Sequence, residues 1–140
     1  MIAEVIARLK TAPGLVDVLP AEDVESIMKG TAPRSGTAFV LPYRERAEPN
    51  ALAMGGFRQR VDVQLLVAFV VRRADDAKGG KRISEFDSYR DAIEQSLAGW
   101  AVEPSNDLFE LVAAQAAPIG NGVTIYVQTW QTSRTLEKLT

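Results

Sequence analysis

The sequence predicts an α/β (α+β) fold: a mainly antiparallel sheet of four to five strands, flanked by two or three helices, with a protruding long β-hairpin or loop arm. Three observations lead to this prediction. The longest β-type run, 57–73, alternates apolar and polar side chains at its start, as half-buried strands do. Two segments, 1–11 and 82–99, repeat apolar residues at helical spacing. An Asn-Gly pair at 121–122 predicts a tight hairpin near the end of the sequence.

Composition and charge exclude several classes of protein. The 140 residues suit a single domain over 1–140, which is large enough to bury a core without disulfides. The chain has no cysteine and no histidine, so thiol chemistry, the commonest general base and the commonest metal ligand are missing. The net charge of −2 favours neither a nucleic acid nor a membrane as partner. We therefore expect a soluble protein that is not an enzyme and uses no cofactor and no metal.

Targeting signals are not expected either. No apolar run approaches the roughly 20 residues that a membrane-spanning helix needs. The start MIAEVIARLK contains an acidic residue and lacks a long apolar stretch, so it does not look like a signal peptide. We expect a non-secreted protein.

The first forty residues are predicted to form two helices and two strands. Apolar residues make one stripe of a short helix over 1–11, which an Ala-Pro-Gly break follows. The segment 15–19 is a short strand or an extended link. A second helix is expected over 20–30, and its glycine stops it. A strand over 37–41 is ended by Pro42.

The strand 57–73 is too long for a small domain. Its odd positions are apolar from Val61 to Val71, while its even positions change from polar to apolar at Leu66, so only the later half is buried on both faces. Seventeen extended residues span roughly 55 Å at ~3.3 Å each. We expect the strand 37–41 to run outward and 57–73 to return, as a hairpin that stands out from the body.

The connection 43–56 has no apolar period and is longer than usual in a compact domain. It mixes arginines with large apolar side chains, a composition that is enriched at the cores of interfaces. The segment is either a mobile surface loop or, over about 43–60, an arm that contacts another subunit. The candidate arm residues are Tyr43, Arg44, Arg46, Leu52, Met54 and Phe57.

The early half of the long strand has one polar face. Its side chains alternate with the apolar ones and come from Arg58, Arg60, Asp62 and Gln64. Two interpretations fit these residues: an ordinary solvated sheet face, or a polar wall that lines a channel or faces a neighbouring subunit.

The second half of the chain is predicted to add a covering helix and a hairpin. The helix 82–99 packs across one face of the sheet. The Asn-Gly turn places Ala116 opposite Val127 and Ala113 opposite Trp130. The Ala/Val/Ile face of this hairpin suits a covering helix, while the Tyr/Gln/Trp face meets water or another subunit, although its aromatic residues also fit a core. The polar tail 133–140 is expected to fray.

The candidate reactive groups all have simpler explanations. Asp75 and Asp76 lie in a polar turn with basic neighbours, and Asp87 and Asp91 follow helical spacing on a solvated face. Gly80 and the lysine after it superficially resemble the end of a phosphate-binding loop, but the required spacing of glycine and hydroxyl residues is absent. We expect no catalytic residue.

Three consecutive motifs resemble the middle of the small tail terminator (tail completion) proteins of tailed phages. The first is an extended strand that ends in proline at 39–42. The second is E-R-A-x-P-N-x-L at 45–52, followed by two glycines, and the third is R-Q-R-V at 58–61. The N-terminal segment, the helix that ends in Gly-Trp and the final hairpin also resemble this family in order and spacing.

This resemblance implies a structural virion protein that forms a homohexameric ring. Such a ring caps the tail tube, ends tube polymerisation and forms the joint to the head connector, or stopper; in contractile tails it also meets the sheath. DNA only passes through the lumen, and no membrane is involved. The protein would lie in the tail or neck of the virion, and in the host cytoplasm during assembly. Two alternatives are another neck or tube protein (a head–tail joining protein or tail tube subunit) and a small dimeric α/β ligand-binding domain.

Overall fold

The computed structural model describes residues 1–27, 29, 33–72, 80–120 and 122–138. Within these ranges, no helix is both long enough and apolar enough to cross a lipid bilayer. The helices and strands, in chain order, are α1 Ile2–Lys10, β1 Asp17–Pro20, α2 Val24–Ile27, β2 Thr37–Ala47, β3 Phe57–Arg72, α3 Gly80–Leu97, β4 Glu110–Gly120 and β5 Val123–Lys138.

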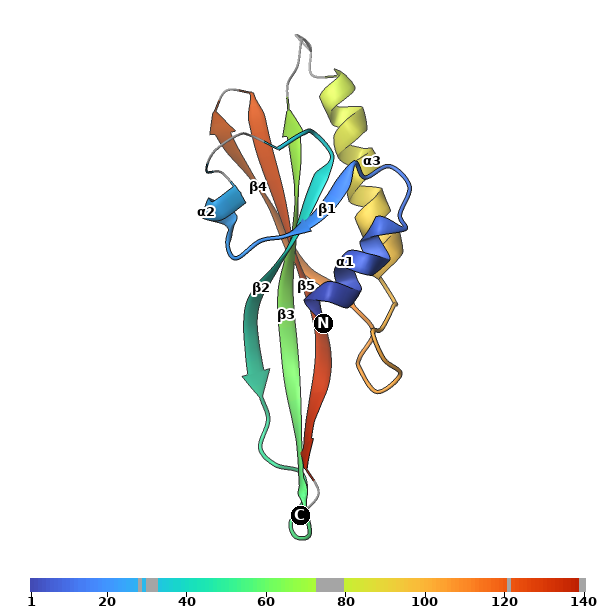
Figure 1. The fold of residues 1–140 in the computed structure, drawn as a ribbon, viewed down its shortest axis with the longest axis vertical. Helices are drawn as coiled ribbons and strands as arrows, with labels where there is room; N and C mark the ends of the chain where they lie inside the picture. The colour runs from blue at the N-terminus through green and yellow to red at the C-terminus, as the bar shows by residue number, and fades with distance from the viewer. Residues whose placement is uncertain (28, 30–32, 73–79, 121, 139–140) are drawn as a thin grey trace.

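The five strands form one sheet in the order β1-β2-β3-β5-β4. The β1–β2 pair is parallel, and the other three pairs are antiparallel. Helices α1 and α3 cover one face of the sheet, and the short α2 lies on the opposite face (Figure 1). This arrangement confirms the predicted fold class, a mainly antiparallel sheet flanked by helices.

The end of β3 that lies among the helices is buried on both faces, as its sequence predicts. On one side Leu65, Val67 and Phe69 belong to the core cluster that includes residues of α1 and α3. On the other side Ala68 and Val70 pack in a second cluster with Ile27 of α2. Burying each large apolar side chain stabilises the fold by roughly 1.5–3 kcal/mol, so this half of β3 is the centre of the core.

Aromatic contacts fasten α3 to the sheet. The ring of Phe69 lies 5.5 Å from that of Phe86, 5.9 Å from that of Tyr89 and 5.2 Å from that of Tyr126. Because these rings come from β3, α3 and β5, the cluster fixes the angle at which the helix crosses the strands.

The prediction that Pro42 ends its strand is wrong. Strand β2 continues to Ala47, with an irregularity in its pairing between Pro42 and Arg44. Beyond Val40, β2 no longer pairs with β1, so this part of it is an edge. A proline, which has no N–H to donate, is tolerated at edges and bulges, and the chain bends there instead of ending its strand.

The prediction of a frayed tail is also wrong for residues 133–138. Strand β5 pairs with β3 without interruption from Val123 to Lys138, where Lys138 lies opposite Phe57. Neither face of this segment is apolar, but the segment pairs with the side of β3 that β2 does not occupy. Its backbone groups are therefore hydrogen-bonded to β3. Residues 139–140 are outside the described part of the chain.

The terminal hairpin has a different register from the predicted one. Ala116 lies opposite Tyr126 and Ala113 opposite Thr129, with irregularities near both ends of β4. The Tyr/Gln/Trp face is the one that α3 covers: Gln128 and Trp130 are both 0% exposed. This face accommodates polar atoms because the Trp130 Nε1 donates to the Gln128 Oε1 at 3.0 Å and the Gln128 Nε2 donates to Glu94 at 3.0 Å.

Several predicted features fall on residues outside the described ranges. They are Asn121, which is the first residue of the turn pair at 121–122, the acidic pair Asp75-Asp76, and positions 28 and 30 at the end of the predicted second helix. Helix α2 itself is four residues long.

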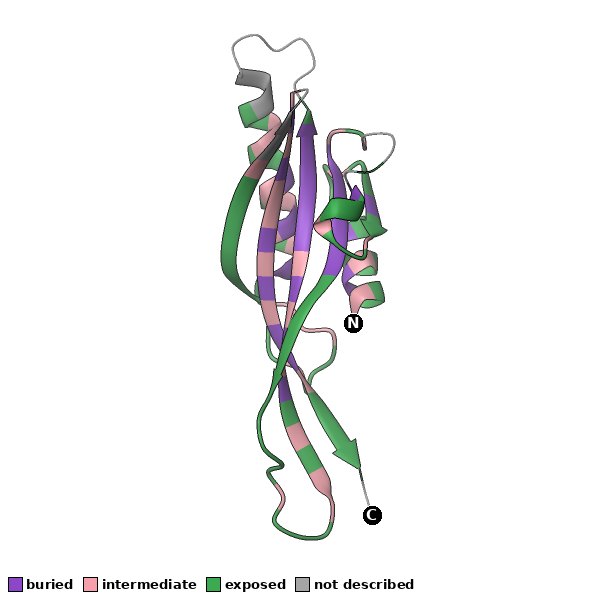
Figure 2. Cartoon of the chain, turned by 90° about the vertical axis from the view of Figure 1, so that its left-hand side faces the viewer, coloured by how far each residue is buried: buried purple, intermediate pink, exposed green. Residues whose placement is uncertain are grey.

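The lower part of the sheet extends beyond the helices as three strands (Figure 1). Residues 44–47 of β2, 57–64 of β3 and 131–138 of β5 form this part, which we call the three-stranded ribbon. Residues 44–47 and 135–138 are exposed, whereas residues along β3 alternate between exposed, half-buried and buried (Figure 2). The sequence predicts a two-stranded hairpin here, and the third strand is the C-terminal half of β5.

Core burial gives the first testable prediction. Replacing Leu65, which is 1% exposed, with alanine removes a side chain from the centre of the core and should lower the free energy of unfolding by about 2–5 kcal/mol. Urea denaturation measures this loss. The matched control is Leu108→Ala, because Leu108 is 58% exposed and its truncation should change the value by no more than about 0.5 kcal/mol. Equal losses in the two variants would contradict the assigned core.

Candidate interaction surface

The three-stranded ribbon has two faces of different chemistry. Opposed residues of paired strands share a face, so the register assigns each side chain. The face that continues from α1 and α3 carries Val61 and Val63. The opposite face, which we call the polar face, is made of Arg44, Arg46, Arg58, Arg60, Asp62, Gln64, Gln131, Ser133, Thr135 and Glu137.

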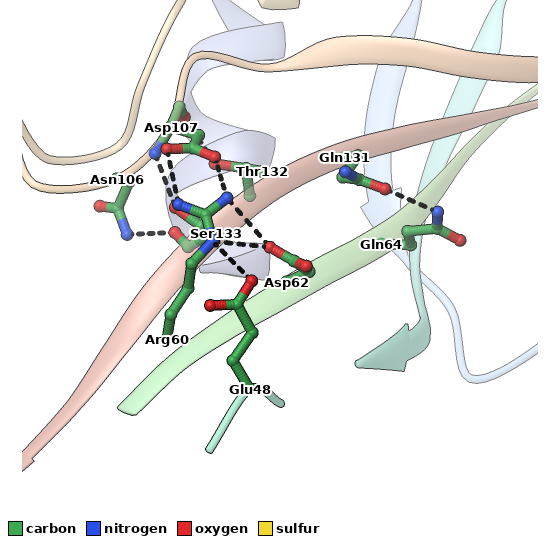
Figure 3. A network of polar contacts seen from close by, with 9 residues as sticks. All are labelled: Glu48, Arg60, Asp62, Gln64, Asn106, Asp107, Gln131, Thr132 and Ser133. Carbon is green, nitrogen blue, oxygen red and sulfur yellow. Dashed lines mark hydrogen bonds and ion pairs between the residues drawn. The ribbon is translucent and has the colours of Figure 1, made fainter. Parts of the chain in front are cut away.

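The four residues predicted to share one face of the long strand do lie on this polar face. Arg58, Arg60, Asp62 and Gln64 alternate along β3 without any irregularity in its pairing with β5. Figure 3 shows three of them with their partners from other segments.

A chain of side-chain hydrogen bonds crosses all three strands at the upper end of the polar face. The Arg44 Nε donates to the Gln64 Oε1 at 2.7 Å, and the Gln64 Nε2 donates to the Gln131 Oε1 at 2.9 Å (Figure 3 shows the second contact). The guanidinium of Arg44 also lies over the Tyr43 ring, 5.2 Å from its centre. These contacts fix the side chain of Arg44 before any partner binds.

Arg60 is the centre of a charged network (Figure 3). Its guanidinium forms an ion pair with Asp107, its Nε donates to Asp62 at 3.0 Å, and Glu48 lies 3.9 Å away. The hydrogen bond to Asp107 raises the pKa of Arg60 above its ordinary value, and the same bond lowers the pKa of Asp107. Because Asp107 precedes β4, this pair ties the ribbon to the loop after α3.

Ser133 holds that loop in place. The backbone N–H of Asp107 donates to the Ser133 Oγ at 2.9 Å, and the Asn106 side-chain amide donates to the Ser133 carbonyl oxygen. The Thr132 hydroxyl donates to the Asp107 carbonyl oxygen at 2.7 Å. The carboxylate of Asp107 is therefore positioned by β5 for its contact with Arg60.

Two further ion pairs link strands of the ribbon. Arg58 contacts Glu137 at 2.8 Å on the polar face. On the opposite face Arg134 donates two hydrogen bonds of 2.9 Å to Glu45, and this contact lowers the pKa of the Glu45 carboxyl. Glu45 and Arg134 flank β3, so the pair crosses over that strand, where Val61 is buried.

The candidate arm residues fall into two groups. Tyr43, Arg44 and Arg46 lie at the upper end of the ribbon, beside Gln64. Leu52, Met54 and Phe57 lie at its tip, about 23 Å away along β3 at ~3.3 Å per residue. Met54 is 88% exposed, whereas Leu52 and Phe57 are half-buried. A single contact patch that contains all six residues is therefore not present.

Asn50 orders the loop that connects β2 to β3. Its Oδ1 accepts hydrogen bonds from the backbone N–H groups of Leu52 at 3.1 Å and Arg58 at 2.9 Å. Its Nδ2 donates to the Leu52 carbonyl oxygen at 3.1 Å. The Pro-Asn-x-Leu part of the sequence motif thus has a structural role, which is to close the tip of the ribbon.

A hollow of about 380 Å³ lies on the polar face. It is lined by Arg44, Arg46, Asp62, Gln64 and Gln131. Two of these residues belong to the candidate arm set and two to the polar strand set, so the structure brings part of both predicted sets together in one concave site.

The partners of the β3 side chains on this surface are hard to predict from the sequence. Nothing in the local sequence marks Asp107, Ser133 or Glu137, because each meets its partner across segments that are far apart in the chain. The one available signal was the alternation of polar residues over 131–138, which has no apolar face and so does not look like a strand.

The surface offers binding contacts rather than reactive groups. In the described part of the chain, no three Asp or Glu side chains gather in a way that could hold a metal ion. Asp87 and Asp91 are exposed, as predicted for a solvated face, and both contact Arg90, at 3.3 and 3.4 Å.

Acid should weaken the ribbon through Glu45 and Asp107. Both carboxyls have lowered pKa values in the folded protein. Their ion pairs therefore stabilise the fold fully when the pH is above the pKa of the unfolded chain, near 4. This stabilisation is lost as the pH falls through the lower pKa values of the folded protein. The contribution is at most about 1 kcal/mol, because both groups are roughly half exposed. Urea denaturation between pH 6 and 2.5 should therefore show a smaller loss of stability for Glu45→Gln/Asp107→Asn than for the unaltered chain.

Glu103→Gln is the control for this acid titration. The Glu103 side chain makes no hydrogen bond or ion pair with another residue in the described ranges. Its variant should follow the pH dependence of the unaltered chain. If the double variant does so as well, the two ion pairs do not contribute to stability.

The tip loop depends on Asn50. Asn50→Ala removes three hydrogen bonds, and a net loss of about 1 kcal/mol should speed amide exchange at Leu52 and Arg58 roughly five-fold. Hydrogen–deuterium exchange measures this change. Met54→Ala in the same loop is the control, since Met54 is almost fully exposed and its variant should exchange at the original rate.

Comparison with known proteins identifies the family. The model of the family described as phage tail terminator protein matches residues 2–139, which confirms the resemblance seen in the motifs between 39 and 61. A search of curated proteins gives no match. A chain of the solved structure "Virion of native gene transfer agent (GTA) particle" is similar over 92% of this chain and 82% of that one, with 15% identity and a TM-score of 0.45. Since the family match covers almost every residue, the chain belongs to the phage tail terminator family and is a structural protein of the phage tail, not an enzyme.

Proposed function

We propose that the chain forms a homohexameric ring that caps the tail tube, ends tube polymerisation and forms the joint to the head connector. Residues 1–140 act as one domain, with an arm over about 43–60. The observation that carries this proposal is the three-stranded ribbon, which extends beyond the helices and presents ordered side chains on its surface. In a closed ring, every copy uses one surface patch to contact one neighbour and a different patch to contact the other. An extension of this kind supplies one of the two patches.

The tip and the upper end of the ribbon have different roles in this proposal. Leu52, Met54 and Phe57 are the apolar contacts at the tip, where Met54 is the most exposed large apolar side chain in the described ranges. Tyr43, Arg44 and Arg46 contact the neighbour with polar groups. Large apolar and arginine side chains are those that interface cores favour.

The polar face of β3 faces a neighbouring subunit or the lumen. Arg58 and Arg60 are both paired with carboxylates, from Glu137 and Asp107. Paired arginines release fewer counterions on contact with phosphate, so this face would hold DNA weakly. Weak contact suits a lumen through which DNA passes.

The proposed partners are the tail tube protein, the head connector or stopper protein and, in a contractile tail, the sheath. The chain is located in the virion, in its tail or neck, and it assembles in the host cytoplasm. The second candidate function is that of another neck or tube protein, such as a head–tail joining protein or a tube subunit. It shares the need for a ring, so the response of the tube separates the two functions.

Ring formation and capping can be measured with the purified chain. Mass photometry should find six copies per particle, alone or with tube protein, and addition to growing tubes should stop their elongation. A chain that stays monomeric at micromolar concentration even with tube protein would contradict the proposal. A chain that polymerises on its own would be a tube subunit instead.

A charge at the tip should impair the ring. Met54→Asp places a carboxylate among the apolar tip contacts and should raise the concentration for half-assembly at least ten-fold. The matched control is Ile83→Asp on α3, where the side chain is 64% exposed and far from the ribbon (Figure 1). If Met54→Asp assembles at the same concentration as the unaltered chain, the tip is not part of the interface.

A further inference from the structure

Two arginine side chains line the hollow on the polar face. Arg44 uses its Nε for Gln64, and its terminal nitrogens donate to no other residue in the described ranges. Arg46 makes no hydrogen bond or ion pair within those ranges, although it lies opposite Asp62. The hollow thus offers two guanidinium groups whose remaining donors suit the oxygens of a carboxylate.

The one carboxylate in the hollow does not cancel this positive charge. Asp62 accepts a hydrogen bond from the Arg60 Nε and lies 3.0 Å from its terminal nitrogen. Its charge is therefore shared with a third arginine outside the hollow. The lining holds two positive charges against one shared negative charge, so an acidic partner is favoured.

The same chain carries a complementary acidic segment on its body. Between Asp17 and Ile27 there are four acidic residues and no basic one. Asp23 is used locally, since its Oδ1 accepts the backbone N–H of Ser26 at 2.7 Å. Glu22 and Glu25 are exposed and make no hydrogen bond or ion pair with another described residue.

The two patches lie in different parts of the molecule. The acidic segment surrounds α2 beside the body of the sheet, and the hollow lies on the ribbon that extends from it (Figure 1). Two different patches on one copy make a head-to-tail contact, in which each copy offers the hollow to one neighbour and the acidic segment to the other.

A nucleic-acid backbone fits the hollow less well than these side chains. Glu48, Asp62 and Glu137 lie on or beside the polar face and would repel a continuous row of phosphates. A concave site of this size instead admits side chains that project from a second protein surface.

We propose that the hollow formed by Arg44 and Arg46 of one copy binds the carboxylates of Glu22 and Glu25 of the next copy. This inference rests on the proposed ring. It names the polar contact that orients neighbouring subunits head to tail within that ring. The contact is electrostatic, so higher salt should raise the concentration needed for ring assembly.

Charge exchange tests the contact. Arg44→Glu/Arg46→Glu and Glu22→Lys/Glu25→Lys should each raise the concentration for half-assembly at least ten-fold, because like charges then face each other across the interface. The variant with all four substitutions should assemble again, since its charges are opposite once more. Mass photometry measures each particle mass, and circular dichroism with amide exchange of β3 verifies that the ribbon is folded.

A control and a milder variant keep the test decisive. Asp87→Lys/Glu103→Lys changes the net charge as much as the acidic-segment variant does, at two exposed positions away from the hollow, and should assemble normally. Arg44→Gln/Arg46→Gln should also weaken the ring if the glutamate variant does not fold.

The possible outcomes are distinct. If Arg44→Glu/Arg46→Glu assembles like the unaltered chain, or if the variant with all four substitutions remains monomeric, the assigned contact is wrong, but the proposed ring is not contradicted. If Arg44→Glu/Arg46→Glu still forms the ring and only loses binding of a double-stranded DNA fragment, the hollow is a DNA contact and the inference is wrong. If the unaltered chain forms no ring at all, the proposed function itself fails.

Discussion

The pairing of β3 on both of its sides is the constraint on which the whole structure depends. β2 lies along one side and β5 along the other, and the pairing with β5 covers every residue of β3. Backbone hydrogen bonds on both sides satisfy the strand whether or not helices cover it. One strand can therefore be a core element at one end, under α1 and α3, and part of an exposed ribbon at the other.

Side chains on the ribbon give it order rather than much stability. Each exposed ion pair contributes about 0–1 kcal/mol, which is small beside the buried apolar side chains of the core. Their geometry matters more than their strength. Arg60 joins β3 to the loop before β4, and Glu45 and Arg134 join β2 to β5 across β3. The three strands are thus fastened to one another and to the body.

The sequence predicted the elements whose side chains carry a clear apolar period. α1, α3, β3 and the two-sided burial of β3 follow from that signal, as does the fold class. It failed where tertiary contacts decide. Pro42 does not end β2 because the strand is an edge there, and 133–138 forms a strand because β3 supplies a partner that the local sequence does not reveal.

The candidate surface could be predicted in part. The shared face of Arg58, Arg60, Asp62 and Gln64 follows from the two-residue period of a strand. The partners of these residues depend on the register between distant strands and on the loop that ends in Asp107. A sequence does not fix such a register, and in the final hairpin the irregularity after Pro118 moves the opposed pairs from Ala113 to Pro118 by one residue.

The pairing of Phe57 with Lys138 also determines how late in synthesis the ribbon can form. The two residues are about eighty positions apart, and the whole of α3 and β4 lies between them. Contacts this distant in sequence form late, because the chain between them must first be ordered. A ribosome-bound chain that lacks β5 has only two of the three strands and lacks Glu137, Ser133 and Arg134. The ribbon is therefore completed only after β5 has been synthesised.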